Sequence, residues 1–275
     1  MISKEAGAEE ATQKQARDIT HLAICSDLRR NILVFLREGE KSLGDLRENL
    51  NVSSTTAIHA LRELEKDNLT FQDRERNYQL TTIGMVIAHK ITDFCNTAEA
   101  LVRAKKILLD HDISGIPEDL LQNIGCLKDA TIITADATDL YKIHNFFMKS
   151  LKDVDIINGI SPIFVSDYPT VFEGILNHQV EVQLIVTADV LEKIMQAADK
   201  KSLQKALDEN LKLYTIKQNP RVAFTSTNKF AFLGLYNLDG SYDVSRLLMG
   251  QSKKAIEWGR ALFEHYVGLS TRVTL

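Results

Sequence analysis

The sequence predicts a multidomain protein of the α+β and α/β classes, with a small helical domain first and a domain built on a mixed sheet after it. Two observations carry this prediction. Within residues 42–69, two short helical patterns are joined by a tight turn. From residue 129 onward, short apolar runs typical of strands alternate with amphipathic helical patterns, which indicates a partly parallel sheet covered by helices.

The composition is that of an ordinary globular protein. The chain has 275 residues, of which 44% are hydrophobic and 25% are charged, and this length allows two domains with their own cores. No apolar run reaches the ~20 residues of a membrane span, and the polar first residues do not resemble a signal peptide. Cys25, Cys95 and Cys126 are too few and too scattered for a disulfide framework. We therefore expect a cytoplasmic protein without a membrane partner.

Residues 42–69 predict a helix-turn-helix. Ser42 can cap the first helix and Ser53 the second, because a side-chain oxygen at that position accepts amide hydrogens that the helix leaves free. Residues 51–52 form the turn between them. In the second helix one inward stripe follows spacings of four and three, and consists of Ala57, Leu61 and Leu64.

The opposite face of the second helix carries small hydroxyls, a histidine and an arginine. Such side chains suit insertion into the major groove of DNA, where they reach base edges and phosphates. We therefore interpret this helix as a recognition helix that binds double-stranded DNA. Its predicted DNA-binding residues are Ser53, Ser54, Thr55, His59 and Arg62.

A hairpin directly after this helix predicts a wing. Residues 70–72 and 78–80 have the pattern of short strands around a charged turn. Arg74 and Arg76 in that turn can reach phosphates or the minor groove. The alternative is that they are solvated turn charges without a function.

The chain has four predicted parts. A flexible lead-in or a frayed helix covers residues 1–20, and the winged helix-turn-helix DNA-binding domain covers residues 21–80. Residues 81–110 form a long linker helix, capped by residues 81–82, that can run unbroken to its end. Residues 111–275 form the C-terminal α/β domain, which senses an effector or mediates assembly.

The linker helix has an apolar stripe that needs a partner. It consists of Ile87, Ile91, Phe94, Ala98, Leu101 and Leu108. We expect the partner to be the same helix of a second copy, because helix-turn-helix proteins commonly read paired half-sites as dimers. Packing on the protein's own winged domain is the alternative.

The C-terminal domain alternates strands and helices. A short helix over 118–124, closed by Gly125, precedes them. The predicted strands cover 130–135, which we expect to be buried, then 155–159, 181–187, 211–217, 222–225 and 229–236. The predicted helices cover 140–151, 168–177, 188–198 and 202–210, followed by a last helix that Ser252 caps.

Four polar residues of this domain are candidates for binding an effector. Ligands of such sheets settle at the carboxyl ends of parallel strands, and Asp136, Ser161 and Thr187 each follow a predicted strand. Arg246 could meet an anionic effector. The alternatives are that Asp136 and Thr187 cap the helices that follow them, and that Arg246 makes a structural salt bridge.

Several stretches resemble the archaeal winged-helix regulators of the methanogenesis and filamentation regulator family, which are found mainly in methanogens. They are SDLRRNIL (26–33), NVSSTTAIHALRELE (51–65), HDISGIPEDLLQNIG (111–125), SPIF (161–164), VEVQLIVTADVLEKI (180–194) and AIEWGRALFEHY (255–266). HDISGIP and WGRALFEHY are more specific than the helix-turn-helix alone. The resemblance implies a dimeric transcription regulator whose C-terminal domain senses a ligand or mediates assembly, and it names no effector.

The charge balance counts against DNA binding. The net charge is -4 and the isoelectric point is about 6.0, whereas affinity for DNA comes largely from neutralising phosphates. Within residues 21–80, nine Lys or Arg stand against ten Asp or Glu. A local patch, doubled by dimerisation, would have to supply the affinity. The rival hypothesis is a winged-helix module that binds a protein partner without direct DNA binding.

The sequence also bears on two other function classes, which are enzymes and metal- or thiol-responsive regulators. The chain lacks G-x-S-x-G, G-x-G-x-x-G and G-x-x-x-x-G-K motifs, and no histidine belongs to a His-x-Lys pair, so we expect neither an enzyme nor a cofactor. A metal- or thiol-responsive regulator is the better rival, because His21 and Cys25 share a helix face and His89 and Cys95 lie on the linker helix. No third or fourth ligand stands at motif spacing, so we expect no metal site. The alternative is that the cysteines are small buried hydrophobes.

Overall fold

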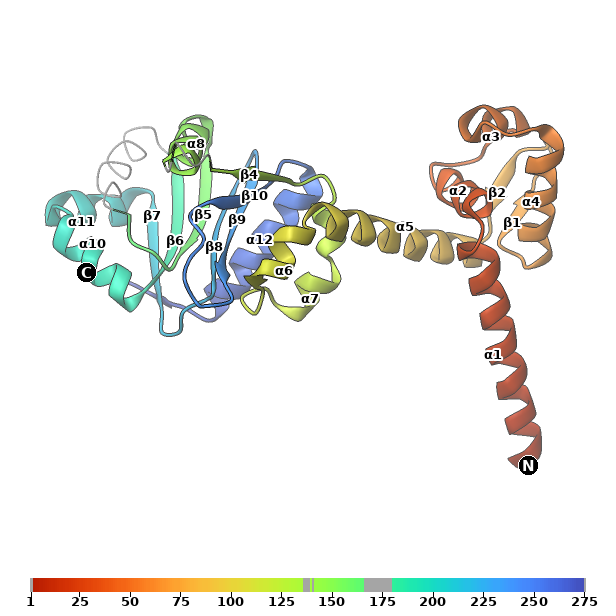
Figure 1. Ribbon diagram of the computed structural model, residues 1–275, viewed down its shortest axis with the longest axis horizontal. Coiled ribbons are helices and arrows are strands. Elements are labelled where there is room, and N and C mark those ends of the chain that lie inside the picture. The colour runs from red at the N-terminus through yellow and green to blue at the C-terminus, as the bar shows by residue number, and fades with distance from the viewer. Residues whose placement is uncertain (1, 136–138, 140, 166–179, 275) are drawn as a thin grey trace. The chain divides into compact units, whose positions relative to one another are not determined.

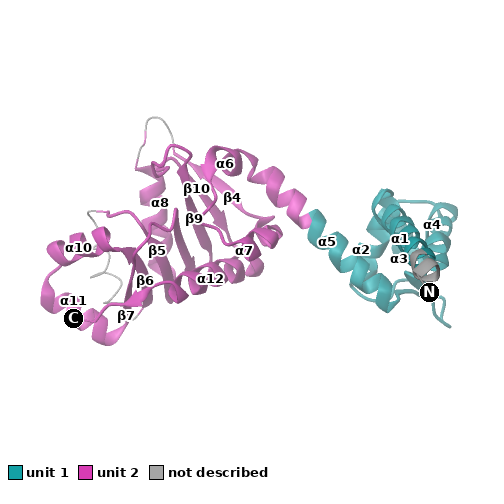
Figure 2. Ribbon diagram, turned by 90° about the horizontal axis from the view of Figure 1, so that it is seen from below, with its two compact units in different colours: residues 1–95 teal, residues 96–275 magenta. Residues whose placement is uncertain are grey.

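A computed structural model describes residues 2–135, 139, 141–165 and 180–274 (Figure 1). By its internal contacts the chain divides into two compact units, residues 1–95 and residues 96–275, which have different colours in Figure 2. The boundary falls inside a helix, between Cys95 and Asn96. The four-part division that the sequence suggests stays a prediction.

The N-terminal unit is helical apart from one hairpin. Its elements are α1 (Ile2–Ile24), α2 (Asp27–Leu36), α3 (Leu43–Leu50), α4 (Ser54–Lys66), β1 (Thr70–Gln72), β2 (Tyr78–Leu80) and the first part of α5 (Thr82–Arg103). The strands β1 and β2 pair antiparallel, with Thr70 opposite Leu80. The two helices, the turn and the hairpin predicted for residues 42–80 are therefore confirmed as secondary structure.

Local hydrogen bonds explain where these helices begin and end. Ser42 and Asp45 form a reciprocal capping box at the start of α3. Asn51 ends that helix in the left-handed conformation with a φ of 50°, which asparagine tolerates better than most residues. Ser53 then caps α4 by accepting a hydrogen bond from the Thr56 amide at 3.1 Å. The tight turn of the helix-turn-helix is thus encoded within twelve residues, 42–53.

The core of this unit forms where α2, α3, α4 and the start of α5 meet. The inward stripe predicted for α4 is confirmed, and Ala60 extends it. Each fully buried leucine of this core contributes about 1.5–3 kcal/mol relative to an exposed one. Its completely buried leucines are Leu33, Leu46, Leu61, Leu64 and Leu69.

The long linker helix differs from its prediction in two ways. It is interrupted at Ala104, where ψ is 5°, and resumes as α6 (Lys105–Asp110), although backbone hydrogen bonds continue past the interruption. Phe94, Ala98 and Leu101 of the predicted stripe are exposed. The last turns of this helix pack instead through Ala104 and Ile107, which are buried in the core of the C-terminal unit.

The C-terminal unit is built on a mixed sheet, as predicted. Among the described residues the sheet has nine strands, in the order β11-β7-β6-β5-β8-β9-β10-β4, with β3 paired to β9. The strands β5, β6 and β7 are mutually parallel, and the other pairings are antiparallel. The strands are β3 (His111–Asp112), β4 (Thr131–Thr134), β5 (Ile156–Ser161), β6 (Glu181–Thr187), β7 (Leu211–Ile216), β8 (Val222–Thr227), β9 (Ala231–Asn237), β10 (Arg246–Gly250) and β11 (Thr271–Arg272).

Each face of this sheet has its own apolar core. On one face α12 (Lys253–Gly268) packs over β8, β9 and β5 (Figure 1). On the other face lie α8 (Lys142–Ser150), α10 (Ala188–Ala197) and α11 (Lys200–Glu209). Strand β6 serves both cores, because Ile185 belongs to the first and its neighbours Leu184 and Val186 belong to the second. The remaining elements are α7 (Glu118–Gln122) and the 3-10 helices η1 (Ile124–Leu127) and η2 (Leu151–Asp153).

Three predictions for this unit are wrong and one cannot be placed. The strand predicted as buried, 130–135, is the edge strand β4, and its Thr131 and Thr134 are exposed because nothing pairs beyond it in the described sheet. The strands β3, β10 and β11 were not predicted. Gly125 lies inside η1 instead of closing a helix, and a Cβ there would stand 2.9 Å from the Thr97 amide nitrogen. The helix predicted for 168–177 lies outside the described residues.

The two most specific motifs of the sequence contact each other. The Trp258 indole nitrogen on α12 donates a hydrogen bond to the Leu120 carbonyl at 2.9 Å. The Tyr266 hydroxyl donates to the Gly115 carbonyl at 2.7 Å, and burial raises the pKa of Tyr266 to about 12. Residues of HDISGIP and WGRALFEHY therefore belong to one packed cluster. No helix among the described residues has the length and apolarity needed to cross a bilayer.

Gly84→Ala should destabilise the N-terminal unit. A Cβ at Gly84 would stand 1.8 Å from the Leu69 carbonyl oxygen, and that oxygen belongs to the backbone and cannot rotate away. We expect a loss of about 1–3 kcal/mol, or more, in the free energy of unfolding, measured by urea titration. Gly44→Ala is the matched control, since its Cβ would meet only Ser42 Oγ at 3.4 Å and alanine favours helices by up to about 1 kcal/mol. Equal stability of the two variants would contradict this packing.

Candidate nucleic-acid interface

The exposed side of α4 carries a straight row of polar side chains. Thr55, His59, Arg62 and Lys66 follow one another at spacings of four, three and four, so they lie on one face of the helix. All four are exposed, whereas the opposite face is buried in the core of the N-terminal unit. Three predicted DNA-binding residues are thus brought together. Lys66 was missed, although the same spacing continued for one more turn would have found it.

The two predicted serines have different positions. Ser53 is exposed, but its hydroxyl caps the helix and also contacts Thr56 Oγ1 at 2.8 Å. Ser54 is half-buried beside the row. A ligand that approaches the start of α4 would therefore meet Thr55 and Thr56 before it reaches Ser54. Thr56 is a third exposed hydroxyl, beside Ser53 and Thr55, and it was not among the predicted residues.

A salt bridge holds α4 against the rest of the unit. Arg29 on α2 forms an ion pair with Glu63 at 2.5 Å, and its Nε donates to the Leu22 carbonyl at 2.7 Å. Glu63 also lies 3.8 Å from the His59 ring. Among the residues that the structure describes, no ion pair involves Arg62 or Lys66. These two cations are therefore available to a negatively charged partner.

The hairpin turn is organised by one carboxylate. Asp73 Oδ1 accepts hydrogen bonds from the amides of Asn77 and Glu75, both at 2.9 Å, and Oδ2 accepts one from Gln79 at 3.0 Å. The bond from Asn77 contributes most to lowering the pKa of Asp73 below its usual value. Arg76 has a φ of 67° in this turn. The carboxylate thus holds the turn in a shape that places Arg74 and Arg76 at its exposed tip.

The structure describes three of the four effector-binding candidates. Ser161 is buried and its hydroxyl donates to the Ile163 carbonyl at 2.8 Å. Thr187 caps α10 by accepting from the Val190 amide at 3.4 Å, so the alternative reading of Thr187 is confirmed. Asp136 lies outside the described residues. The strand before it, β4, is separated from β5 by β8, β9 and β10 in the described sheet.

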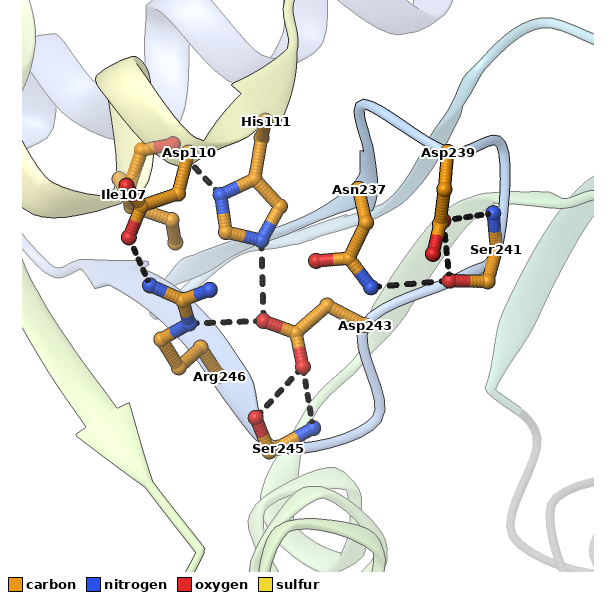
Figure 3. A network of polar contacts seen from close by, with 9 residues as sticks. All are labelled: Ile107, Asp110, His111, Asn237, Asp239, Ser241, Asp243, Ser245 and Arg246. Atoms are coloured by element: carbon orange, nitrogen blue, oxygen red, sulfur yellow. Dashed lines mark hydrogen bonds and ion pairs between the residues drawn. The ribbon is translucent and has the colours of Figure 1, made fainter.

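Arg246 belongs to a polar cluster (Figure 3). Its Nε donates to Asp243 Oδ2 at 2.7 Å and its Nη1 donates to Asp110 Oδ2 at 2.9 Å, which confirms the structural salt bridge as the reading of Arg246. Burial by itself raises the pKa of Asp243, but hydrogen bonds from Ser245, Arg246 and His111 outweigh it and lower the pKa to about 2. The cluster therefore keeps a buried carboxylate ionised by surrounding it with donors.

The cysteine side chains are not fully buried, although the alternative interpretation expected small buried hydrophobes. Cys25 and Cys95 are exposed, and Cys126 is half-buried. His89 is engaged with Arg37, whose Nη2 lies 3.1 Å from His89 Nδ1. In the described part of the chain, no group of three or more His, Cys, Asp or Glu side chains is arranged to hold a metal ion. Among the described residues, the hypothesis of a metal- or thiol-responsive regulator is therefore supported only by isolated pairs of potential ligands.

Two protein-family models match this chain. The model of the N-terminal domain of the methanogenesis regulatory protein FilR1 matches residues 17–99, and the model of its middle domain matches residues 140–268. The chain belongs to the FilR1 family. The FilR1 protein of Methanothrix harundinacea (strain 6Ac) is 27% identical over 245 residues, which cover 88% of this chain and 55% of that protein. The chain therefore spans about half the length of this FilR1 relative.

Solved structures are similar only at a distance. The archaeal chromatin protein TrmBL2, described with a novel mode of DNA binding, is 15% identical, with 86% of this chain and 89% of that chain covered and a TM-score of 0.43. An IclR transcriptional regulator from Alicyclobacillus acidocaldarius is 12% identical, with coverages of 86% and 93% and a TM-score of 0.25. At these scores the likeness carries no argument about function.

Asp243→Asn should reveal the depressed pKa as a pH-dependent loss of stability. Because the folded pKa of about 2 lies below the ordinary 3.8, the ionised carboxylate stabilises the fold fully above pH 3.8 and loses this effect as pH falls toward 2. We expect the variant to be less stable by about 2 kcal/mol at neutral pH, measured by urea unfolding. The difference between the two proteins should shrink below about pH 4. Asp129→Asn, at an exposed carboxylate of the same unit, is the control, and a difference that stays constant to pH 3 would contradict the shift.

Proposed function

We propose that this FilR1-family chain is a transcription regulator that binds double-stranded DNA, with α4 as the recognition helix and the β1–β2 hairpin as the wing. One observation carries the proposal. The exposed face of α4 presents Thr55, His59, Arg62 and Lys66 in one row, opposite a fully buried apolar face. A capped helix with hydroxyl, imidazole and cationic side chains on one open face matches what the major groove accepts.

Each side chain has a distinct part in this mechanism. Thr55 and His59 approach base edges or phosphates near the start of the helix, with Ser53 and Ser54 at its first turn. Arg62 makes the charged contact, and a bidentate bond to a guanine is worth about 1–3 kcal/mol of discrimination. Lys66 extends the row toward the backbone. Arg74 and Arg76 steady the wing on phosphates, which positions the helix without specifying sequence.

We propose that the protein works as a homodimer. Nine cations against ten carboxylates in residues 21–80 give one copy no net positive charge, so a second copy is needed to double the contacts. The apolar row on α5 supplies the interface, because Ile83 and Phe94 lie on one face with 54% and 67% of each residue exposed. An exposed apolar row on a long helix marks an interaction site.

The C-terminal unit is proposed to sense an effector or to support assembly, and the name of the FilR1 relative suggests genes of methanogenesis as targets. The four candidate residues do not indicate the chemical class of the effector. The sequence has no nucleophile–base motif, which favours a regulator over an enzyme. A cytoplasmic location follows from a DNA target and belongs to the same proposal.

A protein-interaction module is the second candidate, and one observation favours it. The isoelectric point of about 6.0 is low for a protein that neutralises phosphates. Salt titration separates the two functions. DNA affinity should fall steeply as salt increases, whereas a flat response would favour the protein partner.

Arg62→Ala and Lys66→Ala should each weaken DNA binding. The experiment uses a duplex enriched from a random library by the full chain, followed by gel-shift titrations at several salt concentrations. We expect Arg62→Ala to cost about 1–3 kcal/mol and to relax specificity, because Arg62 contacts a base edge. Lys66→Ala should lower the salt slope by about 1, because Lys66 contacts a phosphate.

Lys201→Ala is the control for these variants, since Lys201 is an exposed lysine on α11 in the other unit. It should leave affinity and salt slope unchanged. If the library yields no enriched duplex, or if the affinities of all three variants equal that of the natural protein, α4 is not the DNA-reading element.

Phe94→Asp should convert the dimer into a monomer. A carboxylate in this apolar row would be buried without a partner in the interface, which is costly. The measurement is the mass in solution by light scattering, with circular dichroism to verify the fold. Glu99→Gln, on another side of α5, is the control and should remain dimeric. A natural protein that is monomeric at micromolar concentration would contradict the interface.

A further inference from the structure

Glu63 is a carboxylate on the exposed side of α4 that the proposed function does not use. Thr56, His59 and Glu63 follow one another at spacings of three and four, so they form a second row that shares His59 with the polar row on the same helix. The side chain of Glu63 is 39% exposed, beside a His59 side chain that is 77% exposed. A ligand in contact with His59 therefore meets Glu63 one turn further along the helix.

A guanidinium group holds one oxygen of this carboxylate. Helix α2 packs against α4 (Figure 1), and Arg29 of α2 donates from Nη1 to Glu63 Oε2 at 2.5 Å. The same guanidinium donates from Nε to the Leu22 carbonyl at 2.7 Å, and only 19% of the Arg29 side chain is exposed. Because Arg29 is bound through two of its nitrogens, it also fixes the position of Oε2.

The second oxygen of Glu63 has no such partner. Glu63 Oε1 lies 3.8 Å from His59 Nδ1, which is too long for a hydrogen bond. Among the residues that the structure describes, Oε1 accepts no hydrogen bond. Glu63 therefore presents one oriented acceptor beside His59, while its other oxygen is occupied by Arg29.

Arg29 also makes this carboxylate compatible with a DNA surface. The phosphates of the duplex repel a carboxylate that approaches without a counter-charge. The Arg29–Glu63 pair carries one positive and one negative charge, so the pair as a whole is neutral. What remains at Oε1 is the ability to accept a hydrogen bond, which depends on the group that it meets.

The chemistry of the major groove decides which base suits this oxygen. A carboxylate has no hydrogen to donate, so it bonds only to a donor. The donors in the major groove are the amino groups of cytosine and adenine. In adenine the amino group stands beside the N7 acceptor, whose lone pair repels a carboxylate, whereas cytosine offers its amino group without an acceptor on the same base edge. Cytosine is therefore the base that fits Oε1.

We propose that Glu63 is a specificity-determining residue that accepts a hydrogen bond from the amino group of a cytosine through Oε1. Arg29 is a positioning residue, because it acts only by holding Oε2 and balancing its charge. This inference rests on the proposed function, since it assigns one base to the same recognition helix. Glu63 contributes discrimination at one base pair, and Arg62 and Lys66 contribute most of the affinity.

The first experiment compares base preferences. A random duplex library is enriched in parallel with the natural full chain and with Glu63→Gln, and both pools are sequenced. We expect the natural protein to select cytosine at one position of its site. Glu63→Gln should replace this preference by adenine, because glutamine pairs with both the amino group and N7 of adenine. The ratio of the affinities for the two bases at that position, measured by gel shift, should change at least about fivefold.

Glu48→Gln is the matched control, since Glu48 is an exposed carboxylate on α3 of the same unit. It should keep every base preference of the natural protein. Identical preferences of the natural protein and Glu63→Gln would overturn the proposal and leave DNA binding by α4 intact. A library that yields no enriched duplex would overturn both, so the two failures are distinguishable.

The second experiment changes the DNA instead of the protein. The selected cytosine is replaced by N4-methylcytosine, whose methyl group takes the place of the amino hydrogen in the major groove while pairing with guanine is kept. The natural protein should bind this duplex at least about fivefold more weakly. The same replacement at a cytosine outside the site should have no effect. Equal affinity for the methylated and unmethylated sites would overturn the proposal even if Glu63→Gln fails to fold.

Arg29→Gln tests the positioning role. It should weaken the preference for cytosine and leave the preferences at the other positions unchanged, because it releases Oε2 and leaves Glu63 without a counter-charge. Arg29→Lys keeps the positive charge and should restore part of the cytosine preference. A loss of affinity in Arg29→Gln that is equal for all sequences would overturn the positioning role.

Discussion

The candidate interface depends on the burial of one side of α4. Ala57, Leu61 and Leu64 are fully buried, so the helix can rotate very little about its axis without exposing them. That constraint alone decides that Thr55, His59, Arg62 and Lys66 face outward. The Arg29–Glu63 ion pair is a smaller contribution, because it is partly exposed and binds at only one point of the helix. Apolar packing therefore keeps the polar row exposed, and the polar row itself contributes little to the stability of the fold.

The N-terminal unit could be predicted closely from its sequence because its signals are local. Ser42, Asn51 and Ser53 act on amides and dihedral angles within a few residues of themselves, and the stripe of α4 follows from helical spacing alone. The hairpin has the predicted bounds for the same reason, since Asp73 organises the turn through its neighbours. Lys66 was missed only because the row was not followed to the end of the helix.

The C-terminal unit could be predicted only in part, because its positions depend on distant pairings. The apolar run of β4 is compatible with a buried strand, and only the sheet order makes it an edge. The contact of Arg246 with Asp110 joins residues 136 positions apart, and strand β10 pairs with the distant strand β4. Thr187 shows the same ambiguity at a site, since a hydroxyl after a strand can cap a helix or meet a ligand and local sequence does not distinguish the two.

Charge is used differently in the two units, and this difference bears on how the protein would be regulated. On α4 the cations have no carboxylate partners in the described structure, so they suit an external anion and are sensitive to salt. In the cluster around Asp243, the cation Arg246 contacts both carboxylates, Asp243 and Asp110, and the His111 and Asp243 side chains at its centre are screened from solvent. Salt acts weakly on such a buried cluster. Ionic strength should therefore act mainly on the exposed face of α4 and much less on this cluster.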